Sequence, residues 1–510
     1  MPVPRRRRSS SVSYHPSSSG YLDGFRRGGP SMIKFKRKGA FTSGVTIGEA
    51  QANVRLSGWD SYTLHDLNVD NRGKIYVNIR WPGYPPLNYE IPVDGYSGYV
   101  DLQSLVRRVG RAVTHYLQFR SLNLRPSNGT YTALATLALS SSDPALSPKI
   151  IALATGCKCL PKDVLPELGD ALHDSHAEVL ARRCARRWFF EEIGRYVTSE
   201  GQSHWIDRHT DGMFHIKEGV QMIMYISTPP CGDASMRFLA HFQDQEMAML
   251  KDDSVGSEIL LPEGAAARGR NNYALFGVLR TKPGRADSPP TLSMSCSDKI
   301  ARWNVIGIQG ALGSAFLHSA YISRIIIGDV PQVLQETVKA DCERAFWGRL
   351  TVSGLPKGFH VHKPTIHFTS VPFEYSKLSV SPLGSNKSFN ESLCWFADSS
   401  SPHEVLINGL KRGVPPKHRL KKMFRPQLSK IAMLHLYQET LGRLGLDRSE
   451  AQTYYEIKQS VSHYQEAKKC LQGQGCTFAG WVTSGVQWES FNSTSSNELH
   501  NHRNNKEIAR

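Results

Sequence analysis

The strongest pattern of apolar and polar positions lies over Ser175–Val197. Apolar side chains recur there every three or four residues, with arginine and glutamate between them, so the pattern predicts one long helix with a single buried face. The apolar stripe consists of Leu180, Cys184, Trp188, Phe189, Ile193 and Val197.

Other segments predict a mixture of strands and helices. Short apolar runs bounded by glycine or proline favour buried strands, whereas longer stretches with apolar side chains at helical spacing favour helices. The Gly- and Pro-rich stretch 251–290 indicates mostly loop. The expected elements are strands over Lys149–Thr155 and Val220–Ser227, a helix or strand over Asn128–Leu139, and helices over Asp298–Leu317, Ser429–Leu444 and Ser449–Leu471. This mixture predicts an α/β domain over residues 108–490.

The segment before residue 108 has a pattern of its own. Lys74–Trp81 and Leu87–Val93 alternate like strands, and Leu102–Phe119 shows helical spacing. We therefore expect a small α+β module over residues 41–107. It resembles an uncharacterised module of fungal proteins, and neither the resemblance nor the residues imply an activity.

Composition narrows the class of protein. The chain has 510 residues, of which 40% are apolar, enough for a substantial core and for two to four domains. No apolar run approaches the roughly 18–20 residues that a membrane helix needs. The 9 cysteines are too sparse for a disulfide framework and favour buried thiols or metal ligands. We expect a soluble intracellular protein in the nucleus, the cytoplasm or both.

Positive charge is concentrated at the start of the chain. The formal net charge is +17, and residues 1–40 contain ten basic side chains and one acidic side chain. This serine-rich head predicts disorder. Its clusters at Arg5–Arg8 and Lys34–Lys38 fit nuclear targeting, nucleic-acid contacts or mere solvation equally well. The polar tail 491–510 is expected to be frayed.

Three short motifs carry candidate chemistry. His176 and Glu178 open the long helix, Cys231 follows a predicted strand, and Cys296 precedes another predicted helix. One imidazole and two thiolates supply three ligands for tetrahedral zinc and leave the fourth position open, as in catalytic sites. A glutamate two residues after a ligand histidine is placed to transfer protons, and this pairing is the signature of zinc nucleobase deaminases.

Two features qualify this motif. The common deaminase form continues with a second cysteine three residues after the first, but position 234 is Ala234, which argues against a free-nucleoside cytidine deaminase. Cys157 and Cys159 remain alternative ligands on composition alone.

The motifs resemble the adenosine-to-inosine RNA editing deaminases. The resemblance covers residues 108–490, and it rests on His176–Glu178, Pro230–Ala234, Cys296–Trp303 and Gly307–Gly310. Within this eukaryotic family the chain resembles the tRNA-specific deaminases, since it lacks the duplex-binding modules of the other editors. The resemblance implies a cytidine-deaminase-like mixed sheet flanked by helices, with zinc between helix N-termini.

The resemblance also implies a reaction. A flipped-out adenine in tRNA would be hydrolysed at C6 to give inosine, with Glu178 transferring the protons. The expected substrate is alanine tRNA, at the adenosine just 3′ of the anticodon. The rival functions are an editor of structured mRNA and an inactive RNA-binding relative, although Glu178 and a full ligand set count against the second.

A second set of polar residues matches the inositol hexakisphosphate ligands of this family. On the residues alone, these positions would be solvated faces or phosphate contacts. The ligand positions are Arg182, Arg183, Lys299, Arg302, Lys430, Tyr454, Lys458, Tyr464, Lys468 and Trp481. Asp174 and Lys282 would form a polar relay from this cofactor to the zinc. His173, Thr483 and Ser484 depart from the residues that the family or its duplex editors carry there.

Overall fold

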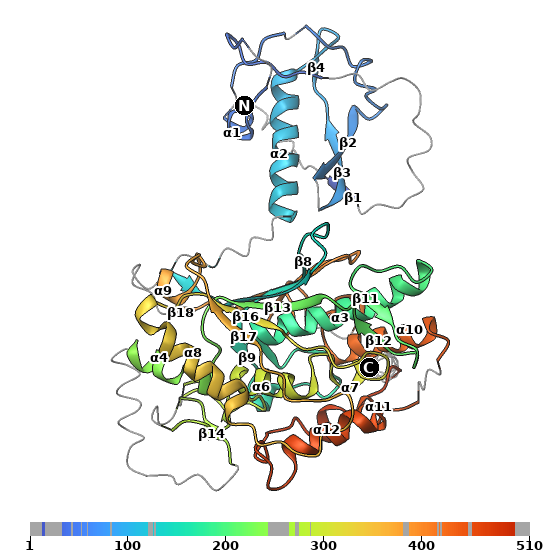
Figure 1. Ribbon diagram of the computed structural model, residues 1–510. Coiled ribbons are helices and arrows are strands. Elements are labelled where there is room, and N and C mark those ends of the chain that lie inside the picture. Colours follow the sequence, from blue (N-terminus) through green and yellow to red (C-terminus); the bar gives the residue numbers. More distant parts are fainter. Residues whose placement is uncertain are drawn as a thin grey trace, which may run out of the picture. The chain divides into compact units, whose positions relative to one another are not determined.

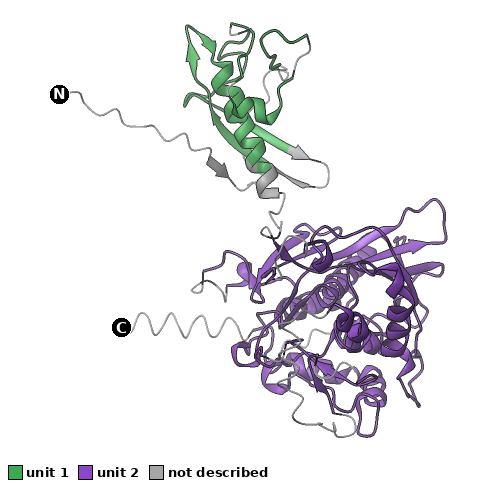
Figure 2. Cartoon of the chain, turned by 90° about the vertical axis from the view of Figure 1, so that its left-hand side faces the viewer, with its two compact units in different colours: residues 1–125 green, residues 126–510 purple. Residues whose placement is uncertain are grey.

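A computed structural model of the 510-residue chain describes most of the sequence. It covers residues 13–15, 33–41, 44–52, 54–58, 60–81, 84–120, 126, 129–242, 265–270, 275–285, 287–380, 387–415, 418, 421–446 and 451–494. These residues form two compact units, Met1–Arg125 and Pro126–Arg510 (Figure 2). None of the helices in these ranges combines the length and apolar character needed to cross a membrane.

In the first unit, one helix packs on a small sheet. Helix α2 (Leu102–Arg120) contacts strand β3 (Tyr84–Pro92), which pairs antiparallel with β2 (Lys74–Trp81). The core between them contains Tyr89, Ile91 and Leu105. The remaining elements of this unit are β1 (Ser13–His15), α1 (Ile47–Gln51), β4 (Gly95–Tyr96) and β5 (Tyr99–Val100).

Two boundaries between parts of the chain differ from those expected from the sequence. The boundary between 107 and 108 falls inside α2, because the apolar face of that helix completes the core of the first unit. Ile33 and Phe35 pack against the same core, so the last part of the expected disordered head belongs to the first unit. The rest of that head, apart from β1, and residues 495–510 of the tail lie outside the described residues.

The second unit is built on an eight-stranded mixed sheet (Figure 1). In order across the sheet, its strands are β17 (Thr365–Phe368), β16 (Arg324–Ile327), β13 (Val220–Ile226), β7 (Leu134–Ser141), β8 (Lys149–Thr155), β19 (Glu391–Phe396), β20 (His403–Ile407) and β21 (Leu410–Lys411). Strands β13, β16 and β17 are parallel, and the other neighbours pair antiparallel.

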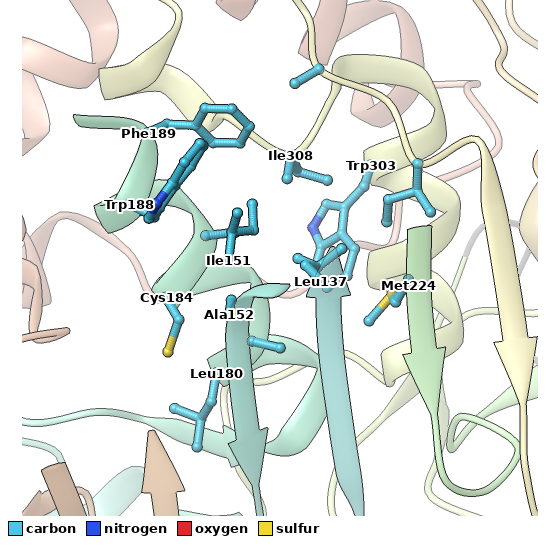
Figure 3. Close-up of a cluster of buried hydrophobic side chains, with 14 of the residues drawn as sticks. Leu137, Ile151, Ala152, Leu180, Cys184, Trp188, Phe189, Met224, Trp303 and Ile308 are labelled. Carbon is cyan, nitrogen blue, oxygen red and sulfur yellow. The ribbon is translucent and has the colours of Figure 1, made fainter. Parts of the chain in front are cut away.

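Helix α3 (Ala177–Thr198) crosses the centre of this sheet against β7, β8 and β19. Figure 3 shows Leu180, Trp188 and Phe189 of α3 in the apolar cluster that also contains Ile151 of β8. Apolar side chains at helical spacing meet the buried strands there, so both predicted elements form around one core. The expected mixed α/β fold, with helices flanking a central sheet, is confirmed.

Two helices that we expected to be continuous are each broken in two. The segment Asp298–Leu317 forms α6 (Cys296–Ile306) and α7 (Gly310–Gly313), because Gly307 ends α6 with a positive φ of 69°. The segment Ser449–Leu471 forms α11 (Tyr454–Ser460) and α12 (Ser462–Gln472), and Val461 leaves helical geometry with ψ at 75°. Apolar spacing continues across both breaks, which is why the pattern predicted one helix in each case.

The late helices pack beside α3 and α6. Helix α10 (Lys430–Arg443) contacts α3, and α12 contacts α6. The other elements are short: β6 (Thr130–Tyr131), β9 (Cys157–Cys159), β10 (Asp174–His176), β11 (Ile206–Arg208), β12 (Phe214–Ile216), α4 (Met236–His241), β14 (Ala267–Arg268), β15 (Arg280–Thr281), α8 (Gln335–Glu343), α9 (Lys377–Val380) and β18 (Lys387–Ser388).

Candidate active site and cationic cavity

The three expected metal ligands come together from three element ends. His176 ends β10 and caps the N-terminus of α3, Cys296 begins α6, and Cys231 lies beyond the end of β13. Gly232 has a φ of 106°, and a side chain there would collide with Ser295. This glycine therefore lets the loop after β13 pack closely against the start of α6.

Distances within this metal-ligand group match tetrahedral coordination. Nδ1 of His176 lies 3.7 Å from Sγ of Cys231 and 3.5 Å from Sγ of Cys296. Zinc bonds of about 2.0 Å to nitrogen and 2.3 Å to sulfur would separate two ligand atoms by about 3.6 Å at a tetrahedral angle. The three side chains can therefore hold one metal ion without rearrangement.

Hydrogen bonds fix the two thiols in place. The Ser297 hydroxyl lies 2.9 Å from the Cys231 carbonyl oxygen, to which it donates, and accepts from the Ala234 amide at 3.1 Å. The backbone amide of Cys296 donates to Sγ of Cys231 at 3.4 Å. A hydrogen bond from Cys296 holds the pKa of the Cys231 thiol well below its usual range, aided by the positive charge of Lys282. Such a thiol readily supplies a thiolate ligand.

The alternative thiols lie on the strand that pairs with the one ending at His176. Cys157 and Cys159 belong to β9, which pairs with β10 so that Cys157 faces His176 in the register. Burial raises the pKa of the Cys157 thiol, as it also raises that of the Cys296 thiol, so the pKa does not separate these two candidates. Cys159 forms a second possible ligand group with Asp174 and His176. The two groups share His176, so a single ion can use only one set.

Glu178 lies in the first turn of α3, two residues after His176 of the metal-ligand group. Its side chain is buried, and Oε2 has no hydrogen-bond partner among the described residues. Burial raises the pKa of this carboxyl. A carboxyl with a raised pKa and an oxygen that is unpaired among the described residues can both accept and return a proton.

Asp174 and Lys282 connect the metal-ligand group to a cavity behind it. Nζ of Lys282 donates to Oδ2 of Asp174 at 2.7 Å and to Sγ of Cys296 at 3.2 Å. Oδ2 of Asp174 also accepts from the Ser293 hydroxyl at 2.6 Å and from Lys299. Because Lys299 lines the cavity, the expected relay is a continuous chain of polar contacts.

All ten residues expected to bind the cofactor line one cavity of about 450 Å³. They come from α3, α6, α10, α11, α12 and the segment after α12. Two charged lining residues among those described were missed. Arg186 lies one turn beyond Arg182 and could have been found by that spacing. Glu489 lies in an irregular segment and had no such signal.

Positive charge in the cavity is only partly balanced. Among the described residues, eight cationic side chains line it, against the two carboxylates of Asp174 and Glu489. Glu489 pairs with Lys430 at 3.2 Å and with Lys458. Burial nevertheless lowers the pKa of Lys430 and of Lys468 to about 8.

Individual side chains in the cavity show the same imbalance. Nε of Arg182 is buried without a hydrogen-bond partner among the described residues, and burial lowers its pKa well below the usual range. A buried cation without a counter-charge is costly, so a bound polyanion would relieve this cavity. The donor set, which consists of lysines, arginines and tyrosine hydroxyls, fits a polyphosphate.

The three residues that depart from the family pattern, His173, Thr483 and Ser484, are compatible with a bound polyphosphate. Burial, followed by the positive charge of Lys430, lowers the pKa of His173 to about 3, so its imidazole is neutral at physiological pH. A neutral imidazole can donate one hydrogen bond, as an asparagine would. Thr483 and Ser484 also line the cavity. Gly310, the first residue of α7, has a φ of 67°, and a Cβ there would lie 3.0 Å from Nη2 of Arg182.

A mixed sheet, with one histidine, two cysteines and a buried glutamate brought together at the end of β10, in the loop after β13 and at the starts of α3 and α6, defines the class of nucleobase deaminases. Residues 152–484, more than half of the chain, match the adenosine-deaminase (editase) domain. The chain belongs to this family, and the resemblance inferred from the motifs is confirmed. Residues 20–147 match a domain of unknown function.

Curated relatives fall into two groups. Human tRNA-specific adenosine deaminase 1 is 27% identical over 454 residues, which cover 68% of this chain and 89% of the relative. Its counterpart from Saccharomyces cerevisiae is 30% identical, over 64% of this chain and 82% of the relative. The double-stranded RNA-specific editase Adar of Drosophila melanogaster is 28% identical, over 55% of this chain and only 41% of the relative.

Proposed function

We propose that this protein hydrolytically deaminates adenosine to inosine in tRNA, at the adenosine just 3′ of the anticodon of alanine tRNA. The observation that carries the proposal is a buried Glu178 with an unused oxygen, next to a preformed His176, Cys231 and Cys296 group, in a member of the editase family. The tRNA substrate is supported by relatives named as tRNA-specific, which match over most of their own length.

His176, Cys231 and Cys296 would hold one zinc ion. Zinc there would supply Lewis-acid activation of the attacking water. Glu178 would accept the proton of that water, donate a proton to the purine ring and assist departure of ammonia. Its raised pKa suits this exchange, since the same carboxyl must be a base in one step and an acid in the next.

The cationic cavity would hold inositol hexakisphosphate. A ligand with six phosphates would bring negative charge to the eight cations that line the cavity among the described residues, which the two carboxylates only partly balance. Lys299 and Asp174 would then link the cofactor through Lys282 to Cys296. This series of polar contacts would fix the orientation of Lys282 and so stabilise the thiolate of the proposed metal ligand Cys296.

Structured mRNA is the alternative substrate, supported by the similarity to a double-stranded RNA-specific editase. An anticodon loop favours tRNA, because less stacking and pairing is lost when its base is flipped out.

Inosine sequencing of bulk tRNA and mRNA tests the choice. Cells with the protein, cells without it and cells that carry only Glu178→Gln should be compared. We expect inosine 3′ of the anticodon of alanine tRNA only with the unaltered protein. Inosine that depends on the protein but occurs only in mRNA would reverse the assignment.

A further inference from the structure

A second group of metal-binding side chains lies away from the proposed catalytic residues. His209 and Asp211 lie in the turn between β11 and β12, and His318 follows α7. Two backbone hydrogen bonds join these segments: the Phe214 amide donates to the Phe316 carbonyl, and the His318 amide donates to the Phe214 carbonyl, both at 2.8 Å. The fold therefore places His318 beside a turn that is distant in sequence.

The possible ligand atoms of these residues lie close together. Oδ2 of Asp211 lies 3.0 Å from Nε2 of His318, and Oδ1 lies 3.3 Å from Nδ1 of His209. All three ligand atoms lie within 4.8 Å of one another. Metal bonds of about 2.0–2.1 Å to nitrogen and oxygen would separate neighbouring ligand atoms by about 3.3 Å at a tetrahedral angle.

The turn itself orients the carboxylate. The amide of Met213 donates to Oδ1 of Asp211 at 2.9 Å, and the His209 amide donates to the Met213 carbonyl at 2.8 Å. The side chains of His209, Asp211 and His318 are 54%, 46% and 41% exposed, so an ion from solvent could reach them and keep water ligands.

A third imidazole borders the group. The ring of His215 packs edge-on against that of His209, with centroids 5.9 Å apart. Nδ1 of His215 is buried and has no hydrogen-bond partner in the described parts of the chain. His215 therefore adds a buried ring nitrogen, unsatisfied among the described residues, to the neighbourhood of His209.

We propose that His209, Asp211 and His318 form a second metal site, which binds a divalent transition-metal ion such as Zn²⁺. Two imidazoles and one carboxylate suit zinc, nickel or copper, whereas magnesium and calcium prefer oxygen ligands. The ion would tie the β11–β12 hairpin to the segment after α7. This site is independent of the proposed deaminase reaction.

Zinc titration of the full chain tests the site. Purified protein, stripped of loosely bound metal, should take up one further equivalent of Zn²⁺ beyond any held by the cysteines. Asp211→Asn and His318→Ala should each lower the affinity for this further equivalent of Zn²⁺ at least about tenfold. A loss of about tenfold is already typical when a residue that only hydrogen-bonds to a metal ligand is replaced. A large excess of Mg²⁺ should not compete.

A matched control is available on the same unit. His360 and His362 are also neighbouring imidazoles, with ring centroids 5.8 Å apart, but they stack with Tyr321 rather than with a carboxylate. A variant with both histidines changed to alanine should retain the further equivalent. Melting curves would identify a variant that fails to fold. Asp211→Asn is expected to fold, because Asp211 is exposed and asparagine has nearly the same size as aspartate.

Cobalt distinguishes the two sites spectroscopically. Co²⁺ bound by thiolates gives strong sulfur-to-metal charge-transfer absorption, whereas Co²⁺ bound by imidazole and carboxylate gives only weak visible bands. We expect the weak bands to vanish in His318→Ala and the strong absorption to persist. Unchanged zinc uptake by folded Asp211→Asn and His318→Ala would overturn the proposal and leave these residues as ordinary ion pairs.

Discussion

The metal-ligand group and the cationic cavity meet at Asp174, but their charges are balanced differently. In the metal-ligand group, thiol, imidazole and ammonium groups hydrogen-bond to one another, and Lys282 contacts both Asp174 and Cys296. In the cavity, eight cations face two carboxylates, and burial lowers the pKa of Lys430 and of Lys468 to about 8.

Because of this difference, substitutions in the metal-ligand group should affect catalysis, whereas substitutions in the cavity should affect folding. Glu178 beside the metal-ligand group is buried with one carboxylate oxygen that has no partner among the described residues, so replacing this acid should remove activity and leave the fold intact. If the cavity holds the proposed polyanion, removing a cation from it should affect stability first. The two regions can therefore be told apart by whether a variant loses turnover or soluble protein.

The largest expected effect is on turnover. Glu178→Ala should retain its metal and its RNA affinity and lose deamination by at least about 10²–10⁴-fold, the usual contribution of a positioned acid or base. Single-turnover assays on tRNA, with the melting temperature and zinc content measured on the same sample, test this. Near-normal turnover would remove Glu178 from the mechanism.

Metal retention should depend on the choice of thiol. Cys296→Ala should lose zinc, because three protein ligands are needed and Nδ1 of His176 lies 3.5 Å from this sulfur. Cys159→Ala is the matched control, since Cys159 also lies beside His176. Elemental analysis decides between them: zinc lost from Cys159→Ala and kept by Cys296→Ala would show that the other group is the metal site.

Substitution in the cavity should affect folding. Lys468→Ala would leave bound phosphate uncompensated, at a cost on the order of 3–5 kcal/mol for breaking a buried ion pair. The neighbouring Lys469 is exposed, so Lys469→Ala is the control. Denaturant melts and soluble yield should change only for Lys468→Ala. If tRNA affinity fell and stability stayed constant, Lys468 would belong to an RNA surface instead.

The smallest expected effect is on the slope of stability with pH. In protein stripped of anions, Lys430 and Lys468 have pKa values of about 8, against 10.5 for an ordinary lysine. The unfolded state therefore binds more protons above pH 8, and stability should rise from about pH 8 to 10. A bound polyanion would keep both lysines protonated and reverse this slope. Melting temperatures with and without inositol hexakisphosphate measure the difference.

The two regions also differ in how far the sequence predicted them. The metal-ligand group could be identified because His176 and Cys296 lie at the starts of helices that the apolar spacing indicates, and Cys231 follows a recognisable strand. The cavity has no such local pattern, since its lysines, arginines and aromatic residues come from helices scattered between residues 182 and 481. Their prediction depended on family resemblance.

What the sequence missed has local physical causes. Apolar spacing runs through Gly307 and Val461, so the breaks between α6 and α7 and between α11 and α12 could not be seen in the pattern. Glu489 lies outside regular structure, and its pairing with Lys430 depends on tertiary packing. The helix α2 crosses the expected domain boundary because its buried face, not its position, assigns it to the first unit.

The central claim is that this protein deaminates tRNA. Purified protein should be incubated with alanine tRNA or with a long RNA duplex, and inosine should be located by sequencing, with Glu178→Gln of equal zinc content as the control. We predict inosine 3′ of the anticodon with the unaltered protein and none with the variant. Zinc-loaded protein that leaves tRNA unchanged, or that edits the duplex faster, would contradict the account.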